Sequence, residues 1–253
     1  MLEIKDLSVS VEKKIILKDF NLSIAKGKTH VIMGPNGSGK STLAKIIAGH
    51  PLFQRKKGEI LFEGKDIFSF LPEQRAQMGI FISFQYPVEI SGVSNFYFLF
   101  SAYNALKKEK KEKVVSEDDF HKIIDAKAKK LNILPEFINR NINVGFSGGE
   151  KKKNEILQML VLDPKIAILD EIDSGLDIDA LKCIAKVIED FKKRGKTLIL
   201  ITHYQRLLNF IKPDYIHVLI DGKIVKTGDS FFAEKLERTG YGSLFLKDGE
   251  INK

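Results

Sequence analysis

Gly34-Pro-Asn-Gly-Ser-Gly-Lys-Ser-Thr42 is the stretch of sequence that decides the fold. It fits the pattern G-x-x-x-x-G-K-[ST] of a phosphate-binding loop. The apolar run Thr29–Met33 predicts a strand before it, and residues 43–48 predict a helix behind it that ends at Gly49. This motif requires a strand, a loop and a helix in that order, and the sequence provides all three.

The residues of this loop have expected roles in holding a polyphosphate. The glycines let the backbone turn tightly, so that several N–H groups point at one anion, and the helix N-terminus adds positive potential. Lys40 is expected to reach the β- and γ-phosphates, and Ser41 to bind Mg²⁺. The expected nucleotide contacts are Gly34, Pro35, Asn36, Gly37, Ser38, Gly39, Lys40, Ser41 and Thr42.

Composition limits the class of protein. The chain has 253 residues, of which 43% are hydrophobic, enough for one large domain with a buried core. Its net charge is +8, a balance that nucleic-acid-binding proteins share. Most lysines alternate with acids, however, and the sequence contains neither an aromatic RNA-binding motif nor a zinc-finger spacing. We therefore expect no nucleic acid as a partner.

The sequence also predicts no direct membrane insertion. Residues 1–5 read as the start of a strand rather than as an apolar signal segment. The most apolar stretch, residues 79–100, contains Gln85, Glu89 and Gly92 and is too polar to be a membrane span. Cys183 is the only cysteine, so a disulfide within the chain is excluded and a reducing compartment is favoured. We expect a cytoplasmic protein, or one of the plastid stroma if the source bears plastids.

Apolar periodicity organises the rest of the chain into an α/β pattern. Further strands are expected at residues 2–11, 15–24, 58–62, 80–84, 165–169 and 197–201, and in a hairpin at 215–226. Further helices are expected at residues 72–78, 95–106, 118–131, 150–162 and 178–193. The charged run 107–113 predicts a solvated loop or helix end. We expect a single domain in which residues 1–85 and 144–253 form an α/β core with a β subdomain, and 86–143 a helical subdomain.

Two carboxylates follow the apolar strand expected at 165–169. Asp170 at the strand end could hold the Mg²⁺ that Ser41 also contacts. Glu171 points elsewhere and could polarise the attacking water. Adjacent acids after a strand are common in loops, so this pattern alone is a weak signal.

A second candidate anion site is Phe146-Ser-Gly-Gly-Glu150, which opens the helix expected at 150–162. Two glycines, a hydroxyl and a helix N-terminus together provide N–H donors and positive potential. A capped helix start with Ser147 as N-cap explains the same residues. Both interpretations stay open on the residues alone.

The order of these motifs resembles that of ABC-type ATPases, with Gln85, Asp177 and His203 at the family's remaining motif positions. In that family, the phosphate loop of one copy and the Ser-Gly-Gly motif of another enclose the same ATP. The resemblance implies an ABC-type ATPase head and a transient, ATP-dependent homodimer. It further implies nucleotide contacts from Ser147, Gly148, Gly149, Glu150 and Asp177, catalytic roles for Glu171, His203 and Gln85, and Mg²⁺ held by Ser41, Gln85 and Asp170.

The chain resembles one branch of this family in particular. Residues 84–95, 148–159, 173–181 and 202–208 closely resemble the SufC family, the ATPases of the SUF iron–sulfur cluster assembly system. That resemblance implies an ATPase that drives conformational change in a scaffold of SufB- and SufD-like proteins. We expect the scaffold contact near residues 85–100, where Tyr86, Phe96, Tyr97 and Phe98 follow Gln85. The alternative is the ATPase subunit of an ABC transporter.

Two further expectations concern single side chains. Many ABC ATPases stack adenine on an aromatic ring near the end of the first strand, where this chain has Val11, so we expect adenine to be held weakly. Lys152, in the first turn of the helix after the Ser-Gly-Gly motif, is a candidate partner that holds Glu171 in an unproductive pose. Solvated lysines at this position are the alternative.

Overall fold

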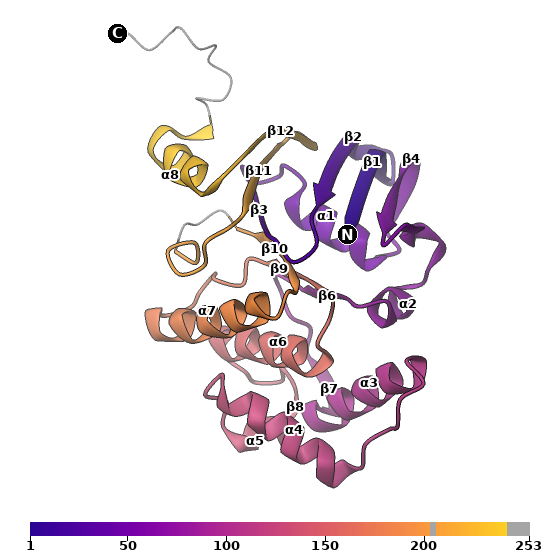
Figure 1. Ribbon diagram of the computed structural model, residues 1–253, viewed down its shortest axis with the longest axis vertical. Coiled ribbons are helices and arrows are strands. Elements are labelled where there is room, and N and C mark those ends of the chain that lie inside the picture. The colour runs from indigo at the N-terminus through magenta and orange to yellow at the C-terminus, as the bar shows by residue number, and fades with distance from the viewer. Residues whose placement is uncertain (203–205, 242–253) are drawn as a thin grey trace, which may run out of the picture.

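The computed structural model describes residues 1–202 and 206–241 (Figure 1). The strands are β1 (Leu2–Val11), β2 (Lys14–Ile24), β3 (Thr29–Met33), β4 (Phe53–Phe62), β5 (Lys65–Asp66), β6 (Ile80–Ser83), β7 (Ile90–Ser94), β8 (Asn141–Ile142), β9 (Ile166–Asp170), β10 (Thr197–Ile201), β11 (Tyr215–Ile220) and β12 (Lys223–Gly228). The helices are α1 (Lys40–Ala48), the 3₁₀ turn Ile67–Ser69, α2 (Pro72–Gln77), α3 (Asn95–Glu109), α4 (Glu117–Lys129), α5 (Pro135–Asn139), α6 (Gly148–Leu162), α7 (Ile178–Lys193) and α8 (Ser230–Thr239).

A six-stranded sheet in the order β12-β11-β3-β10-β9-β6 lies at the centre of the molecule. Five of its strands are parallel, and β12 pairs antiparallel to β11 at one edge. Every residue of β3, β9 and β10 is buried, which explains why these strands read as continuous apolar runs. Because the strands are parallel, the carboxyl ends of β3, β6 and β9 meet at one edge, where ligands of such sheets bind.

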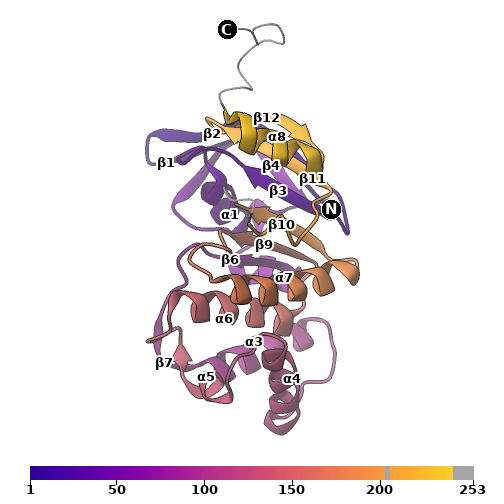
Figure 2. The same cartoon turned by 90° about the vertical axis from the view of Figure 1, so that its left-hand side faces the viewer.

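The two faces of this sheet are covered by different layers, as the turned view in Figure 2 shows. Side chains alternate between the faces, so that Val31 joins the core cluster of α6 and α7 while Ile32 joins that of α1. The second cluster also includes the antiparallel sheet β2-β1-β4-β5, which lies beyond α1. Helices α3 and α4 pack on α6, so they lie one layer further from the sheet. Among the described residues, no helix has the length and apolar content needed to cross a bilayer.

The structure differs from the sequence-based expectation at several element ends. Strand β4 begins at Phe53, five residues before the expected start, because its polar first half pairs with β1, with Phe53 opposite Val11. Helix α3 runs into the charged segment as far as Glu109, where Lys107 and Lys108 lie favourably at its C-terminus. Helices α5 and α8 and the short strands β7 and β8 were not expected.

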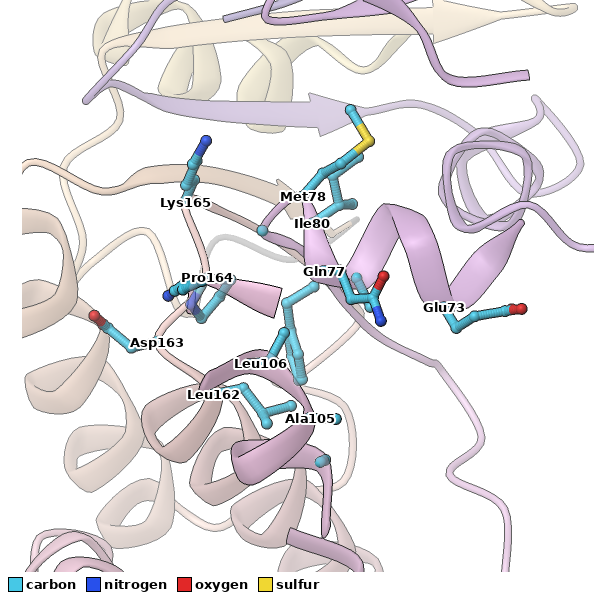
Figure 3. Close-up of a pocket in the computed structure, with 15 residues that line it drawn as sticks. Glu73, Gln77, Met78, Ile80, Ala105, Leu106, Leu162, Asp163, Pro164 and Lys165 are labelled. Carbon is cyan, nitrogen blue, oxygen red and sulfur yellow. The ribbon is translucent and has the colours of Figure 1, made fainter. Parts of the chain in front are cut away.

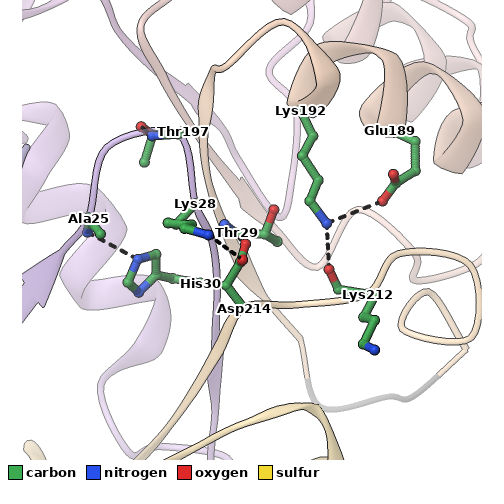
Figure 4. A network of polar contacts seen from close by, with 10 residues as sticks. Ala25, Lys28, Thr29, His30, Glu189, Lys192, Thr197, Lys212 and Asp214 are labelled. Atoms are coloured by element: carbon green, nitrogen blue, oxygen red, sulfur yellow. Dashed lines mark hydrogen bonds and ion pairs between the residues drawn. The ribbon is translucent and has the colours of Figure 1, made fainter.

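Two buried histidines link β3 to β11 near the amino ends of these strands. The Ala25 N–H donates to Nε2 of His30 at 3.1 Å (Figure 4), so the His30 proton sits on Nδ1. That Nδ1–H donates to Nε2 of His217 at 2.9 Å, and Nδ1 of His217 donates to the Thr227 hydroxyl at 2.9 Å. Burial lowers the pKa of both rings to about 4. The pair is therefore neutral near neutral pH, with fixed tautomers.

This pair gives a prediction about stability in mild acid. A histidine whose pKa is lowered by folding binds its proton more tightly in the unfolded chain, so its stabilising contribution is present above pH 6.5 and is lost as the pH falls towards 4. Between pH 7 and pH 5 the loss is about 2 kcal/mol for each histidine. His217→Phe is expected to flatten this part of the pH dependence by about that amount. Urea unfolding at the two pH values measures it.

The comparison must be made between the variant and the parent chain, because Glu155 titrates in the same range. Burial raises the pKa of Glu155 to about 7, so its contribution to stability grows as the pH falls. The difference between the two chains cancels this contribution. If the free energy of unfolding changes equally with pH in the variant and in the parent chain, His217 has the same proton affinity in the folded and unfolded states.

Candidate nucleotide-binding site

The phosphate loop connects β3 to α1 at the carboxyl edge of the central sheet. A Cβ atom at Gly34 would lie 2.0 Å from the carbonyl oxygen of Leu219, so only glycine fits where the loop leaves the strand. Gly39 has φ 107° and is the N-cap of α1, which begins at Lys40, three residues before the expected start. The first turn of α1 therefore points its N–H groups at the loop, as an anion site requires.

Lys40 lies inside the loop that precedes it. Its Nζ donates to the carbonyl oxygens of Gly34 at 2.8 Å and Pro35 at 2.9 Å, and the side chain is buried. Burial lowers the pKa of Lys40, while the nearby carboxylates of Glu171 and Asp170 oppose that shift. The loop thus holds a cation at the place where the motif predicts the β- and γ-phosphates.

Asp170 and Ser41 form the part of the site that fits a divalent cation. Asp170 ends β9, is buried, and accepts a hydrogen bond from the Ser41 hydroxyl. Burial raises the pKa of Asp170, and the Ser41 bond opposes this. Its Oδ1 has no hydrogen-bond partner in the described part of the chain, a costly arrangement for a buried carboxylate. Carboxylate and hydroxyl oxygens are the ligands that Mg²⁺ prefers, so these residues fit the ion.

Gln85 and Glu171 meet across the ends of β6 and β9. The Gln85 amide nitrogen donates to Oε2 of Glu171 at 2.5 Å, and the Glu171 N–H donates to the Ile201 carbonyl at 2.8 Å. Glu171 is buried and has φ 49°, so its backbone does not continue the extended conformation of β9, which ends at Asp170. The structure therefore brings Lys40, Ser41, Gln85, Asp170 and Glu171 to one edge of the sheet.

The Ser-Gly-Gly segment lies outside this group. Ser147 is the N-cap of α6, and the N–H and side chain of Ser147 exchange hydrogen bonds with Glu150 in a capping box. Ser147 and Gly148 are exposed. Asp177 likewise caps α7, accepting from the Ala180 N–H at 2.7 Å. Across residues 1–202 and 206–241, no hydrogen bond or ion pair joins Ser147–Glu150 or Asp177 to the phosphate loop.

His203 and Lys152 are the remaining residues with a role expected from the sequence. His203 lies outside the described residues. Lys152 is buried, but its Nζ donates to the carbonyl oxygens of Phe84 at 3.2 Å and Gln85 at 2.9 Å instead of pairing with Glu171. The structure shows neither of the two alternatives left open by the sequence: the Gln85 side chain lies on the Glu171 carboxylate, and Lys152 is buried against the Gln85 backbone rather than solvated.

The structure adds residues that the sequence analysis missed. Glu155 of α6 is buried against the end of β6, where it binds Ser83 and Phe84. The signal for it was an acid three residues after Lys152 and one residue before the apolar run that starts at Ile156. The hydroxyl of Tyr241 hydrogen-bonds the backbone of Gly34, and burial raises its pKa. No pattern near residue 241 indicates that contact.

A separate cavity of about 250 Å³ lies at the amino end of β6 (Figure 3). Apolar side chains from α2, from the end of α3 and from the α6–β9 connection dominate its lining, among them Met78, Ile80, Leu106 and Leu162. The lining also includes four charged residues, Glu73, Lys110, Asp163 and Lys165. The candidate nucleotide site lies at the other end of this strand, where Gln85 follows β6.

Comparison with known proteins agrees with this geometry. The family model described as ABC transporter matches residues 17–174. A protein named probable ATP-dependent transporter SufC, from Escherichia coli (strain K12), is 50% identical over 244 residues, which cover 96% of this chain and 98% of that protein. The probable ATP-dependent transporter ycf16 of Trieres chinensis is 54% identical over 241 residues, which cover 95% of this chain and 96% of that protein.

Solved structures show the same fold. The dimeric structure of a bacterial ABC transporter cassette aligns with a TM-score of 0.78 at 23% identity, covering 91% of this chain and 99% of the cassette. A post-hydrolysis state of an ATP-binding cassette with ADP and Pi aligns with a TM-score of 0.79 at 22% identity and the same coverage. The ABC-type α/β fold expected from the motifs is confirmed. The chain belongs to the family of ABC ATPases and, within that family, to the SufC type.

Proposed function

We propose that this chain is the ATP-hydrolysing subunit that drives conformational change in a SufB–SufD-type scaffold during iron–sulfur cluster assembly. The observation that carries the proposal is an exposed apolar surface directly after Gln85. We call it the 86–98 surface; its exposed side chains are Tyr86, Val88, Ile90, Val93, Tyr97 and Phe98. A partner bound there would sit one residue from a side chain that bonds Glu171.

In the proposed reaction the chain positions the phosphates and the attacking water, since phosphoryl transfer needs little covalent chemistry from the protein. Lys40 and the loop N–H groups bind the β- and γ-phosphates. Ser41, Asp170 and Gln85 would hold Mg²⁺, which when bound would neutralise charge on the phosphate oxygens. Glu171 polarises the water, and Gln85 orients Glu171 and the water. His203 is proposed to contact the γ-phosphate.

Two copies of the chain are proposed to complete the site when ATP is bound. The exposed Ser147 and Gly148 and their separation from the phosphate loop support this arrangement. In the dimer, Ser147, Gly148, Gly149 and Glu150 of one copy would face the ATP on the loop of the other, and Asp177 would line the seam. We also propose that residues 86–143 form a helical subdomain beside the α/β core, supported by the packing of α3 and α4 on α6 rather than on the sheet.

The 86–98 surface can be tested with one charge. Tyr86 is 81% exposed, so Tyr86→Asp changes the surface without disturbing the core. We expect it to weaken binding of a purified SufB–SufD-type scaffold at least about tenfold, because it places a charge in an apolar contact. Affinity for a fluorescent ATP analogue is expected to stay unchanged.

Phe231→Asp is the matched control for this test. Phe231 is another exposed aromatic, on α8, outside the 86–98 surface. The control is expected to bind both scaffold and nucleotide like the parent chain. Loss of scaffold binding by both variants would point to a general effect of charge, and full scaffold binding by Tyr86→Asp would contradict the proposed contact.

The second candidate function is the ATPase subunit of an ABC transporter. The names of the two relatives described above, which call them probable ATP-dependent transporters, favour it. The same 86–98 surface would then receive a segment of a membrane protein. Copurification separates the two functions, since the first predicts recovery with scaffold proteins and the second with detergent-extracted membrane proteins.

A further inference from the structure

The end of β6 is the point where the buried sheet gives way to the 86–98 surface. Ser83, the last residue of the strand, is fully buried, whereas Tyr86 is the most exposed large hydrophobic residue among those described. Between them, the backbone conformation of Phe84 and Gln85 determines whether the Gln85 side chain can reach the Glu171 carboxylate. Any group that fixes this backbone therefore fixes the contact between Gln85 and Glu171.

Glu155 of α6 binds the end of β6 with both of its oxygens, one to a side chain and one to the backbone. Oε2 accepts a hydrogen bond from the Ser83 hydroxyl at 2.7 Å, and Oε1 accepts one from the Phe84 N–H at 3.1 Å. Glu155 is buried, and an apolar residue at its position would avoid the desolvation that a carboxylate suffers there. What the carboxylate provides is two hydrogen bonds to one short segment.

Two neighbours of Glu155 on α6 hold the same stretch of chain, Lys152 directly and Asn154 through Asn143. Lys152 donates to the carbonyl oxygens of Phe84 and Gln85, as described above. The Asn154 amide donates to Oδ1 of Asn143 at 3.0 Å, and the Asn143 amide donates to the Val88 carbonyl at 2.8 Å. The first turns of α6, immediately after the Ser-Gly-Gly segment, thus anchor the chain from residue 83 to residue 88.

We propose that Glu155 is a positioning residue for ATP hydrolysis. It ties the end of β6 to α6, so that Gln85 keeps its place against Glu171 and moves with α6 when that helix moves. Glu155 contacts neither the proposed nucleotide nor the water, and it acts through Gln85. The inference therefore rests on the role proposed above for Gln85, and it adds the residue that couples Gln85 to the helix behind the Ser-Gly-Gly segment.

Substitutions at Glu155 separate positioning from simple packing. Glu155→Leu keeps the volume but removes both acceptors, and is expected to lower kcat for ATP hydrolysis about tenfold while KM for ATP stays within about twofold. Glu155→Gln keeps an oxygen for the Phe84 N–H, and its amide can donate to the Ser83 hydroxyl. It is expected to restore most of kcat. Gln158→Leu, on the same helix, is the matched control and is expected to change neither constant.

A milder variant at Ser83, the partner of Glu155, keeps the proposal testable if Glu155→Leu fails to fold. Ser83→Ala removes one of the two bonds to Glu155 and leaves α6 intact. It is expected to lower kcat about threefold, again with KM unchanged. Folding of each variant is checked by thermal unfolding without nucleotide. If Ser83→Ala and Glu155→Leu both hydrolyse ATP like the parent chain, the proposal is overturned.

A double-mutant cycle with Gln85→Ala tests whether Glu155 works through Gln85. If it does, Gln85→Ala with Glu155→Leu is no slower than Gln85→Ala alone, because the effects of coupled residues do not add. Multiplied losses would overturn the proposal. An unchanged kcat in Gln85→Ala itself would overturn the role of Gln85 instead, whereas a slow Gln85→Ala beside a fast Glu155→Leu would overturn the role of Glu155 alone.

Discussion

Lys40→Ala is expected to weaken ATP binding by about 100-fold or more. A hydrogen bond to a charged group contributes about 1.5–3 kcal/mol, and Lys40 is expected to make more than one such bond to the β- and γ-phosphates. Its ammonium lies within 2.9 Å of two carbonyl oxygens of the loop, so it is already in place before phosphate arrives. Alanine leaves the loop N–H groups and the helix dipole, which are weaker anion donors than a full charge. Isothermal titration with ATP measures the loss directly.

Lys45→Ala is the matched control for this variant. Lys45 lies in the last turn of the same helix and is exposed, and it makes none of the loop contacts described for Lys40. The control is expected to bind ATP like the parent chain, and thermal unfolding without nucleotide should show that both variants fold. Parent-like ATP affinity in Lys40→Ala would remove the loop from the nucleotide site.

Glu171→Gln is expected to slow hydrolysis about 100- to 1,000-fold while ATP still binds, because a general base contributes factors of that size. The amide has nearly the shape of the carboxylate, so the contact with Gln85 can persist, but it cannot take a proton from water. If two copies enclose ATP, the variant should also accumulate as an ATP-dependent dimer. Single-turnover kinetics and size-exclusion chromatography with ATP measure the two effects.

Glu73→Gln provides the comparison for the loss of one negative charge. Glu73 is exposed on α2, beside the cavity at the amino end of β6 and so at the far end of that strand from Gln85. It is expected to hydrolyse ATP at the parent rate and to show no additional dimer. A parent-like rate in Glu171→Gln would exclude Glu171 as the group that activates water.

Where local pattern and tertiary structure agree, the fold could be predicted from the sequence. The strand Thr29–Met33 has the expected bounds because its side chains are buried on both faces, as in the middle of a parallel sheet, and the sequence shows this as a continuous apolar run. The N-terminal half of β4 could not be predicted, since its polar residues hold a strand conformation through backbone pairing with β1. Pairing with a distant strand leaves no trace in local periodicity.

The same division runs through the candidate site. Lys40, Ser41 and Asp170 belong to motifs whose spacing fixes their geometry, and the structure brings them together. The contact of Gln85 with Glu171 joins residues 86 positions apart, and that of Glu155 with Ser83 joins residues 72 apart. The first contact depends on the pairing of β6 with β9, and the second on how α6 packs beside β6. The two alternatives for Lys152, a pairing with Glu171 or a solvated side chain, considered charge and exposure without that packing, and the structure shows neither.

The polar first turns of α6 have a thermodynamic consequence. One helix carries the Ser-Gly-Gly segment at its start and, within two turns, the side chains that hold the chain from residue 83 to residue 88. If ATP bound at the Ser-Gly-Gly segment shifts α6, it changes the binding free energy of a partner at residues 83–88. This coupling must be reciprocal. The factor by which ATP strengthens scaffold binding then equals the factor by which the scaffold strengthens ATP binding. A scaffold held on the 86–98 surface would thus lower the ATP concentration at which the chain responds, without touching the nucleotide.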